Sequence, residues 1–132
     1  MPHPLMFAPD DPLLARLRGI AFALPGAREK LSHGHPAFHT VKVFAYFGGS
    51  QRIGGEWVRH ERAVLFLPEP GLGPALRADP RTWVPAYLGP AGWLGQDLGG
   101  HTDWEEVAEF VEGSYRQTAP RRLVADLDVR GT

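Results

Sequence analysis

The chain has 132 residues, a formal net charge of −1 and no cysteine. This length suits one domain with a single hydrophobic core. The missing cysteines exclude disulfides, thiolate metal sites and a cysteine nucleophile, and the near-neutral charge argues against a uniformly basic nucleic-acid-binding protein. No segment reaches the ~20 apolar residues of a membrane span, and the first residues do not have the pattern of a signal peptide. We therefore expect one cytoplasmic domain over 1–132, with loose tails at 1–9 and 124–132.

The first predicted element is a helix over residues 11–24. Asp11 supplies a capping oxygen, and Pro12 lies in the first turn, where a missing N–H costs nothing. Apolar residues then recur at helical spacing. The sequence Leu-Pro-Gly at 24–26 ends the helix.

A strand is predicted over residues 38–47, after a bend at Gly34 and Pro36. Its side chains alternate between two faces. The face expected to meet the core carries Val41, Val43, Ala45 and Phe47. The opposite face carries Thr40, Lys42, Phe44 and Tyr46.

The middle of the chain is predicted to consist of short elements separated by glycine and proline. The polar residues 51–62 indicate a hairpin tip or a mobile loop. The elements expected after it are a strand at 63–67, a short helix at 72–79, an extended segment at 82–88, a turn at 89–92 and a strand at 93–98. Pro85 cannot donate to a strand ladder, so the 82–88 segment is expected at a sheet edge or bulge.

The last predicted helix covers residues 103–118. Asp103 and Glu106 have the spacing of a capping box. Apolar residues form one stripe, in which Trp104 and Tyr115 are expected to anchor the core, and glutamates line the opposite face. Pro120 ends the helix.

Three motifs occur in order along the chain. They are GHPAF at 34–38 followed by KVFA at 42–45, PAYLG at 85–89 followed by GWLG at 92–95, and DW at 103–104 followed by SYRQTAPRRL at 114–123. Together they resemble the MmcQ/YjbR family over about residues 12–123. The resemblance implies a bacterial protein with an α+β, CyaY-like (frataxin-like) fold. In that two-layer fold, the N- and C-terminal helices pack on one face of an antiparallel sheet. The resemblance also implies DNA binding, through what is described as a double-wing motif, without established catalytic residues.

Three histidines near the bend are the candidates for a metal site: His33, His35 and His39. They lack helical i,i+4 spacing and have no carboxylate nearby in sequence. We therefore predict no metal site and no cofactor, with His35 bonded to the backbone of the bend and the other two at the surface.

One face of the sheet is expected to remain uncovered by helices. The candidates there for base stacking or ligand contact are Phe44, Tyr46, Tyr87 and Trp93. The alternative is that the segment 68–92 folds over these rings and buries them. The 85–95 hairpin is the place where a ligand or partner is expected to meet the molecule, unless its glycines serve only to let a ring pack flat.

Two kinds of partner are compatible with these features. The first hypothesis is DNA, held by Lys42, Arg52, Arg59, Arg62, Arg116, Arg121 and Arg122. The second is a protein or small ligand, bound without catalysis by the open sheet face and the 85–95 hairpin. An enzyme ranks third, because no catalytic constellation is apparent. We expect a monomer or a weak dimer.

Overall fold

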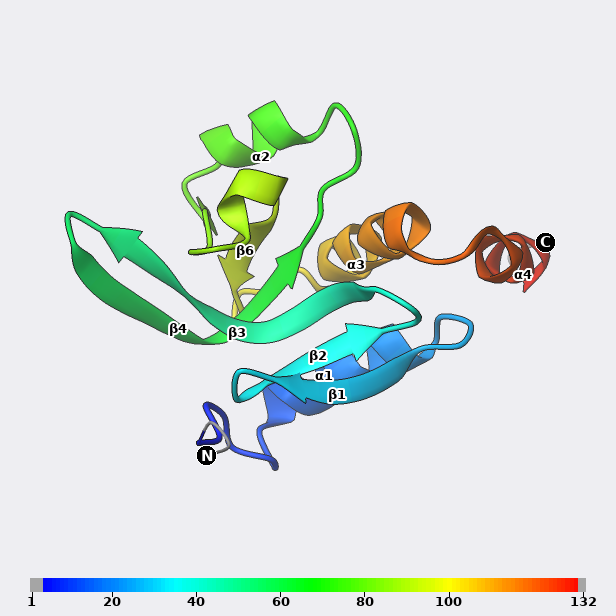
Figure 1. Cartoon of the computed structure of the whole chain (residues 1–132), viewed down its shortest axis with the longest axis horizontal. Helices are drawn as coiled ribbons and strands as arrows, with labels where there is room; N and C mark the ends of the chain where they lie inside the picture. Colours follow the sequence, from blue (N-terminus) through cyan, green and yellow to red (C-terminus); the bar gives the residue numbers. More distant parts are fainter. Residues whose placement is uncertain (1–3, 131–132) are drawn as a thin grey trace.

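The computed structural model describes residues 4–130, which form a six-stranded antiparallel sheet and accompanying helices (Figure 1). The strand order is β1-β2-β3-β4-β6-β5. The strands are β1 (Arg28–Ser32), β2 (His35–His39), β3 (Val43–Ile53), β4 (Glu56–Phe66), β5 (Thr82–Trp83) and β6 (Leu94–Asp97). The helices are α1 (Pro12–Phe22), α2 (Gly73–Ala78), the 3-10 helix η1 (Gly89–Ala91), α3 (Trp104–Thr118) and α4 (Arg121–Arg130). Between residues 4 and 130, no helix is both long and apolar enough to span a bilayer.

The main core lies between the sheet and the N- and C-terminal helices. It joins Leu14 and Leu17 of α1, Phe47 and Phe66 of the sheet, and Tyr115 of α3, all of them fully buried. Burial of this apolar surface is the main force that holds the two layers together. The predicted α+β fold, with terminal helices packed on one face of an antiparallel sheet, is confirmed.

The caps that predicted the two long helices are present. Asp11 Oδ1 accepts a hydrogen bond from Leu13 N at 2.9 Å, and Asp103 Oδ1 accepts from the Glu105 and Glu106 amides at 3.1 and 3.2 Å. The predicted helices at 11–24, 72–79 and 103–118 correspond to α1, α2 and α3. Of the two expected core anchors, Tyr115 is fully buried, whereas Trp104 is half-buried with the Arg16 guanidinium 4.8 Å from its ring.

Strand β1 was not predicted. It is the edge strand that pairs with β2, and most of its side chains are exposed. An exposed edge strand has no apolar alternation in its sequence, so the pattern that indicates a strand was missing.

The strand predicted over 38–47 is two strands joined by a turn. Val41, expected in the core, lies in that turn and is 76% exposed. His39 pairs with Val43 and Phe38 pairs with Ala45, so Phe44 is an extra residue on β3. This bulge breaks the alternation of the strand. As a result Phe44 points to the helix side, where its ring meets Tyr115 edge-on with centroids 5.3 Å apart.

The polar segment 51–62, predicted as a loop, forms the outer half of the long β3–β4 hairpin. Its strands pair as far as Ile53 and Glu56. The two turn residues, Gly54 and Gly55, have φ angles of 55° and 83°, which favour glycine. Both faces of this outer half are largely exposed, which explains its polar sequence.

Two further predictions are corrected. In the segment 82–88, only Thr82 and Trp83 form a strand, and the chain then turns through Pro85 and Tyr87, whose φ is 67°. Residues 121–130, expected in part as a loose tail, form α4, which buries Leu123 in the main core. The tail residues 1–3 and 131–132 lie outside the described residues.

A smaller apolar cluster lies on the second face of the sheet. Val64 and Phe66 of β4 point into the main core, and the alternate residues Ala63 and Leu65 point into the second cluster. Trp83 and Trp93 cover them. The chain between Thr82 and Trp93 therefore covers part of the second face. The predicted alternative, in which the segment 68–92 buries the four candidate rings, holds for Trp93 and in part for Tyr46, whereas Tyr87 is 85% exposed and Phe44 is buried on the helix side.

Candidate functional site

Two pockets border the chain segment that crosses the second face of the sheet. They lie on either side of the chain segment around Trp83 to Leu88 and have volumes of about 790 and 750 Å³. Both volumes fall within the range of about 300–1,000 Å³ that is typical of small-ligand sites. We refer to them as the His60 pocket and the Trp57 pocket.

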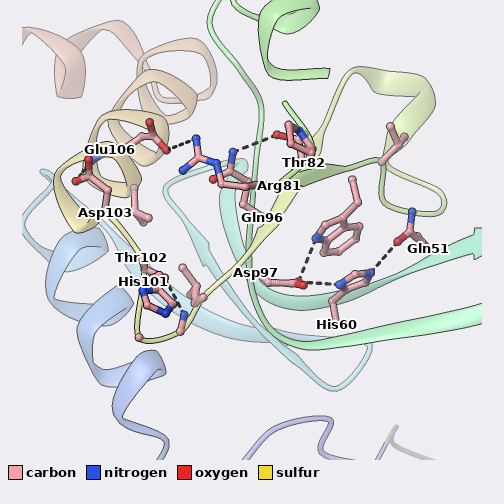
Figure 2. A pocket seen from close by; sticks show the side chains of 17 residues that line it. Gln51, His60, Arg81, Thr82, Gln96, Asp97, His101, Thr102, Asp103 and Glu106 are labelled. Atoms are coloured by element: carbon pink, nitrogen blue, oxygen red, sulfur yellow. Dashed lines mark hydrogen bonds and ion pairs between the residues drawn. The ribbon is translucent and has the colours of Figure 1, made fainter. Parts of the chain in front are cut away.

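The His60 pocket is lined by β3, β4, β5, β6 and the start of α3 (Figure 2). His60 lies between Asp97 and Gln51. Its Nδ1 is 2.7 Å from Asp97 Oδ1, and its Nε2 is 2.8 Å from Gln51 Oε1. The imidazole stacks on Trp83 at 3.8 Å between centroids, and the Trp83 indole donates to the same Asp97 oxygen at 3.2 Å.

Both ring nitrogens of His60 are therefore engaged. An imidazolium would donate to both oxygens, and a neutral ring requires the Gln51 amide to be reversed so that its NH₂ faces the ring. The imidazolium has no lone pair that could accept a proton, and the neutral ring must first release its hydrogen bond with Gln51. This geometry favours binding over general-base catalysis.

Acidic groups dominate the charge of the His60 pocket. Asp97, Asp103 and Glu106 line it, against one arginine, Arg81. Arg81 is itself paired with Glu106 at 3.3 Å and with Asp79 at 2.7 Å. Its hydrogen bond lowers the pKa of Asp79 to about 2, and the same contact raises the pKa of Arg81. The pocket is a poor place for a phosphate group.

The Trp57 pocket is mainly apolar. It lies between the β3–β4 hairpin, the N-terminal end of β2 and the turn at 85–88. Leu65 and the half-buried Tyr46 are among its lining residues, as are Met6, His35, Trp57 and Tyr87. Among the described residues, no aspartate or glutamate lines the Trp57 pocket.

Two exposed aromatic rings border the Trp57 pocket. Trp57 is 50% exposed and Tyr87 is 85% exposed. Their centroids are 5.9 Å apart, and their planes are tilted by 31°. Arg52 of β3 pairs with Trp57 of β4. Its guanidinium lies 4.6 Å from the centre of the Trp57 ring. This arrangement exposes a large aromatic surface beside a cation.

His35 lies in the wall of the same pocket. Its Nδ1 is buried and has no hydrogen-bond partner among the described residues. Burial lowers the pKa of His35, and the Phe47 backbone acts in the opposite direction through a hydrogen bond. The neutral imidazole is therefore favoured in the folded protein.

The cations predicted to bind DNA do not form one surface. Arg52 and Arg59 are exposed on the β3–β4 hairpin, while Arg121 and Arg122 are exposed on α4. These two elements lie at opposite ends of the molecule in Figure 1. Lys42 is exposed in the turn between β2 and β3.

The two remaining predicted cations are held by carboxylates. Arg62 bonds to the buried Asp11 cap at 2.8 Å. Arg116 lies 2.8 Å from Asp128 and 3.4 Å from Glu112, and the Asp128 hydrogen bond raises its pKa. Phosphate contact by either residue would compete with these pairs.

The predicted stacking residues differ in accessibility. Phe44 is fully buried under α3, so the stacking role predicted for it is wrong. Trp93 is almost fully buried, and Tyr46 is half-buried against it with centroids 5.4 Å apart. Tyr87 alone of the four is strongly exposed.

The three candidate metal-binding histidines do not converge. His33 and His35 line the Trp57 pocket, whereas His39 Nδ1 is 2.7 Å from the Thr40 carbonyl at the other end of β2. In residues 4–130, no group of three or more His, Cys, Asp or Glu side chains is arranged to hold a metal ion.

The sequence-based interpretation missed Trp57 and the cluster of His60, Gln51 and Asp97. Trp57, Gln51 and His60 fall in the segment 51–62, which was predicted as a loop or hairpin tip. Trp57 and Val58 are followed by four polar residues, so this segment has no alternation of apolar and polar residues that would indicate a strand. The available signal was the glycine pair at 54–55, which is typical of a hairpin turn.

The fold is a two-layer α+β arrangement, with two pockets beside the segment that crosses the second face of the sheet. The YjbR family model matches residues 22–117, and the chain belongs to this family. No curated protein matches the sequence significantly.

Proposed function

We propose that this protein binds DNA through the Trp57 side of the β3–β4 hairpin, with a preference for unpaired strands. The observation that carries the proposal is the exposed pair of Trp57 and Tyr87, with Arg52 stacked on Trp57. Proteins that bind single strands combine aromatic rings for stacking with cations for the backbone. The DNA-binding role implied by the family resemblance points in the same direction.

The electrostatics of the hairpin support this choice. Arg59 of β4 pairs with Ser50 of β3. Its Nη2 lies 3.8 Å from Sδ of Met6, which lines the pocket. Arg52 and Arg59 thus flank a pocket without acidic residues in its described lining, and Glu61 lies 3.4 Å from Arg59 as a counter-charge. In this proposal the two arginines contact phosphates, and Lys42, Arg121 and Arg122 lie outside the contact surface.

Fluorescence anisotropy tests the proposal with a labelled single strand and with its duplex at ~0.15 M salt. We expect a Kd of about 10⁻⁴–10⁻⁶ M for the single strand, the range of sequence-independent binding. Trp57→Ala should weaken binding by about 1–3 kcal/mol, or roughly 5- to 150-fold, as the loss of one stacked base does. Phe22→Ala, which removes an exposed ring on α1, is the matched control and should bind like the parent protein. No binding at ~100 μM protein would reject the proposal.

A second candidate function is the binding of a small ligand in the His60 pocket. The ordered cluster of His60, Asp97 and Gln51 favours it, because polar groups fixed in one geometry are typical of such sites. Chemical-shift mapping against a fragment library would test it. Shifts confined to residues outside this pocket would show that the cluster is structural.

A further inference from the structure

We propose that the Trp57 pocket holds one nucleobase that is unstacked from a bound strand. This inference rests on the proposed function, and it adds that the part of the DNA strand that enters the Trp57 pocket is a base. Single-stranded nucleic acids are commonly recognised through unstacked bases held on aromatic rings. The pocket places such rings beside a concave apolar surface.

The lining of the pocket suits a flat, mostly apolar group. Leu65 is buried and Tyr46 half-buried, so they form its inner side, while the exposed rings of Trp57 and Tyr87 form its mouth. At about 750 Å³ it is large enough for a small ligand such as a nucleoside. A base that enters between these residues would cover apolar surface that is now exposed to water, which stabilises the complex.

The pocket wall also provides a polar group in need of a partner. His35 Nδ1 is buried without a hydrogen bond in the described part of the chain. A buried polar atom without a hydrogen bond destabilises the folded state. The edge of a base carries both donors and acceptors, so a base that faces His35 would supply the missing partner after a small adjustment of the ring.

Charge distinguishes this pocket from its neighbour. A base in a strand brings a phosphodiester with it, and three carboxylates line the His60 pocket, where that charge would be repelled. The Trp57 pocket has no carboxylate in its described lining, and Arg52 and Arg59 lie beside its mouth. The negative backbone of the strand is therefore compatible with the Trp57 pocket and not with the His60 pocket.

Backbone amide shifts in ¹⁵N-labelled protein test the inference. The probes are thymidine and adenosine, which carry a base without a phosphate, and a short single-stranded oligonucleotide is titrated in parallel. We expect both nucleosides, at ~1 mM and above, to shift the amides of Gly48, Gly49, Ser50 and Ala86, all of which line the pocket. The oligonucleotide should shift the same amides at lower concentration.

Two matched variants locate the effect. Ala86→Leu fills the pocket without altering Trp57, and it should weaken nucleoside binding at least tenfold. Ala91→Leu makes the same change at an exposed position of η1 that lines neither pocket, and it should have no effect. Circular dichroism of both variants shows whether each has folded.

The outcomes separate the two claims. If the oligonucleotide binds in a Trp57-dependent way but nucleosides leave the pocket amides unchanged, the base pocket is rejected and the proposed function stands. Nucleoside binding that Ala86→Leu leaves intact also rejects the pocket. If the oligonucleotide does not bind, the proposed function fails, and the inference that a strand supplies the base fails with it.

Discussion

Tyr115 of α3 donates a hydrogen bond from its phenol to the carbonyl of Pro25, with the two oxygens 2.6 Å apart. Both residues are fully buried, and Pro25 lies in the connection between α1 and β1. Burial raises the pKa of Tyr115, so the phenol stays protonated and remains a donor. The YjbR family model matches residues 22–117, and this bond joins a residue near the start of that region to one near its end.

The first prediction concerns this bond. Tyr115→Phe keeps the ring against Phe44 and leaves the Pro25 carbonyl without its partner. We expect the free energy of unfolding to fall by about 1–3 kcal/mol, the cost of an unsatisfied buried acceptor. Urea denaturation measures it, with Tyr87→Phe, an exposed phenol, as the control. Equal stability of the two variants would show that the bond contributes nothing.

The second prediction concerns the close approach of Gly95 and Trp83. A Cβ added at Gly95 would lie 2.7 Å from the Trp83 ring. Gly95→Ala should therefore displace the ring and lower the free energy of unfolding by about 1–3 kcal/mol, as overpacking does. Gly100→Ala meets nothing within 4 Å and should be nearly neutral. A Gly95→Ala melting temperature equal to that of Gly100→Ala would contradict the packing described for Trp83.

The third prediction is a pH dependence from His35. Burial, with smaller like-charge effects from Arg59 and His33, lowers the pKa of His35 in the folded protein below its usual value of about 6.5. The unfolded chain then binds more protons between the two pKa values, so stability rises with pH across that window. The contribution is complete above about pH 6.5 and is lost as pH falls toward the folded pKa.

His35→Gln removes this titration and is the test variant. Between pH 7.5 and 5, the parent protein should lose more free energy of unfolding than the variant loses, by urea denaturation at each pH. Parallel pH profiles for the two proteins would show that His35 does not titrate differently on folding.

The fold could be predicted where local signals agree with the tertiary structure. Asp11 and Asp103 cap the helices that their spacing indicated, and the apolar stripe that contains Tyr115 faces the core. The prediction failed where tertiary structure overrides the pattern. The bulge at Phe44 reverses a side chain that strict alternation places on the other face, and β1 has no apolar pattern because it is an exposed edge.

The candidate site could be predicted only in part. Arg52, Arg59 and Tyr87 were among the predicted contact residues. Tyr87 lines the Trp57 pocket, and the two arginines contact Trp57 and Met6, which also line it. Their grouping with Trp57 depends on the pairing of β3 with β4 and on the turn at 85–88, which brings Tyr87 to a residue 30 positions earlier. His60 and Asp97 are 37 positions apart and meet through the pairing of β4 with β6. Such contacts arise from topology and leave no local signal in the sequence.

The most direct test of the proposed DNA-binding surface is the salt dependence of single-strand binding in two double variants. Arg52→Ala with Arg59→Ala removes the hairpin cations, and Arg121→Ala with Arg122→Ala removes the same number of charges from α4. Each phosphate contact on a single strand contributes about 0.7 to the slope of log K against log salt concentration. The hairpin variant should flatten that slope by about 1.4, and the α4 variant should leave it unchanged. A slope that flattens for the α4 variant and not for the hairpin variant would contradict the account.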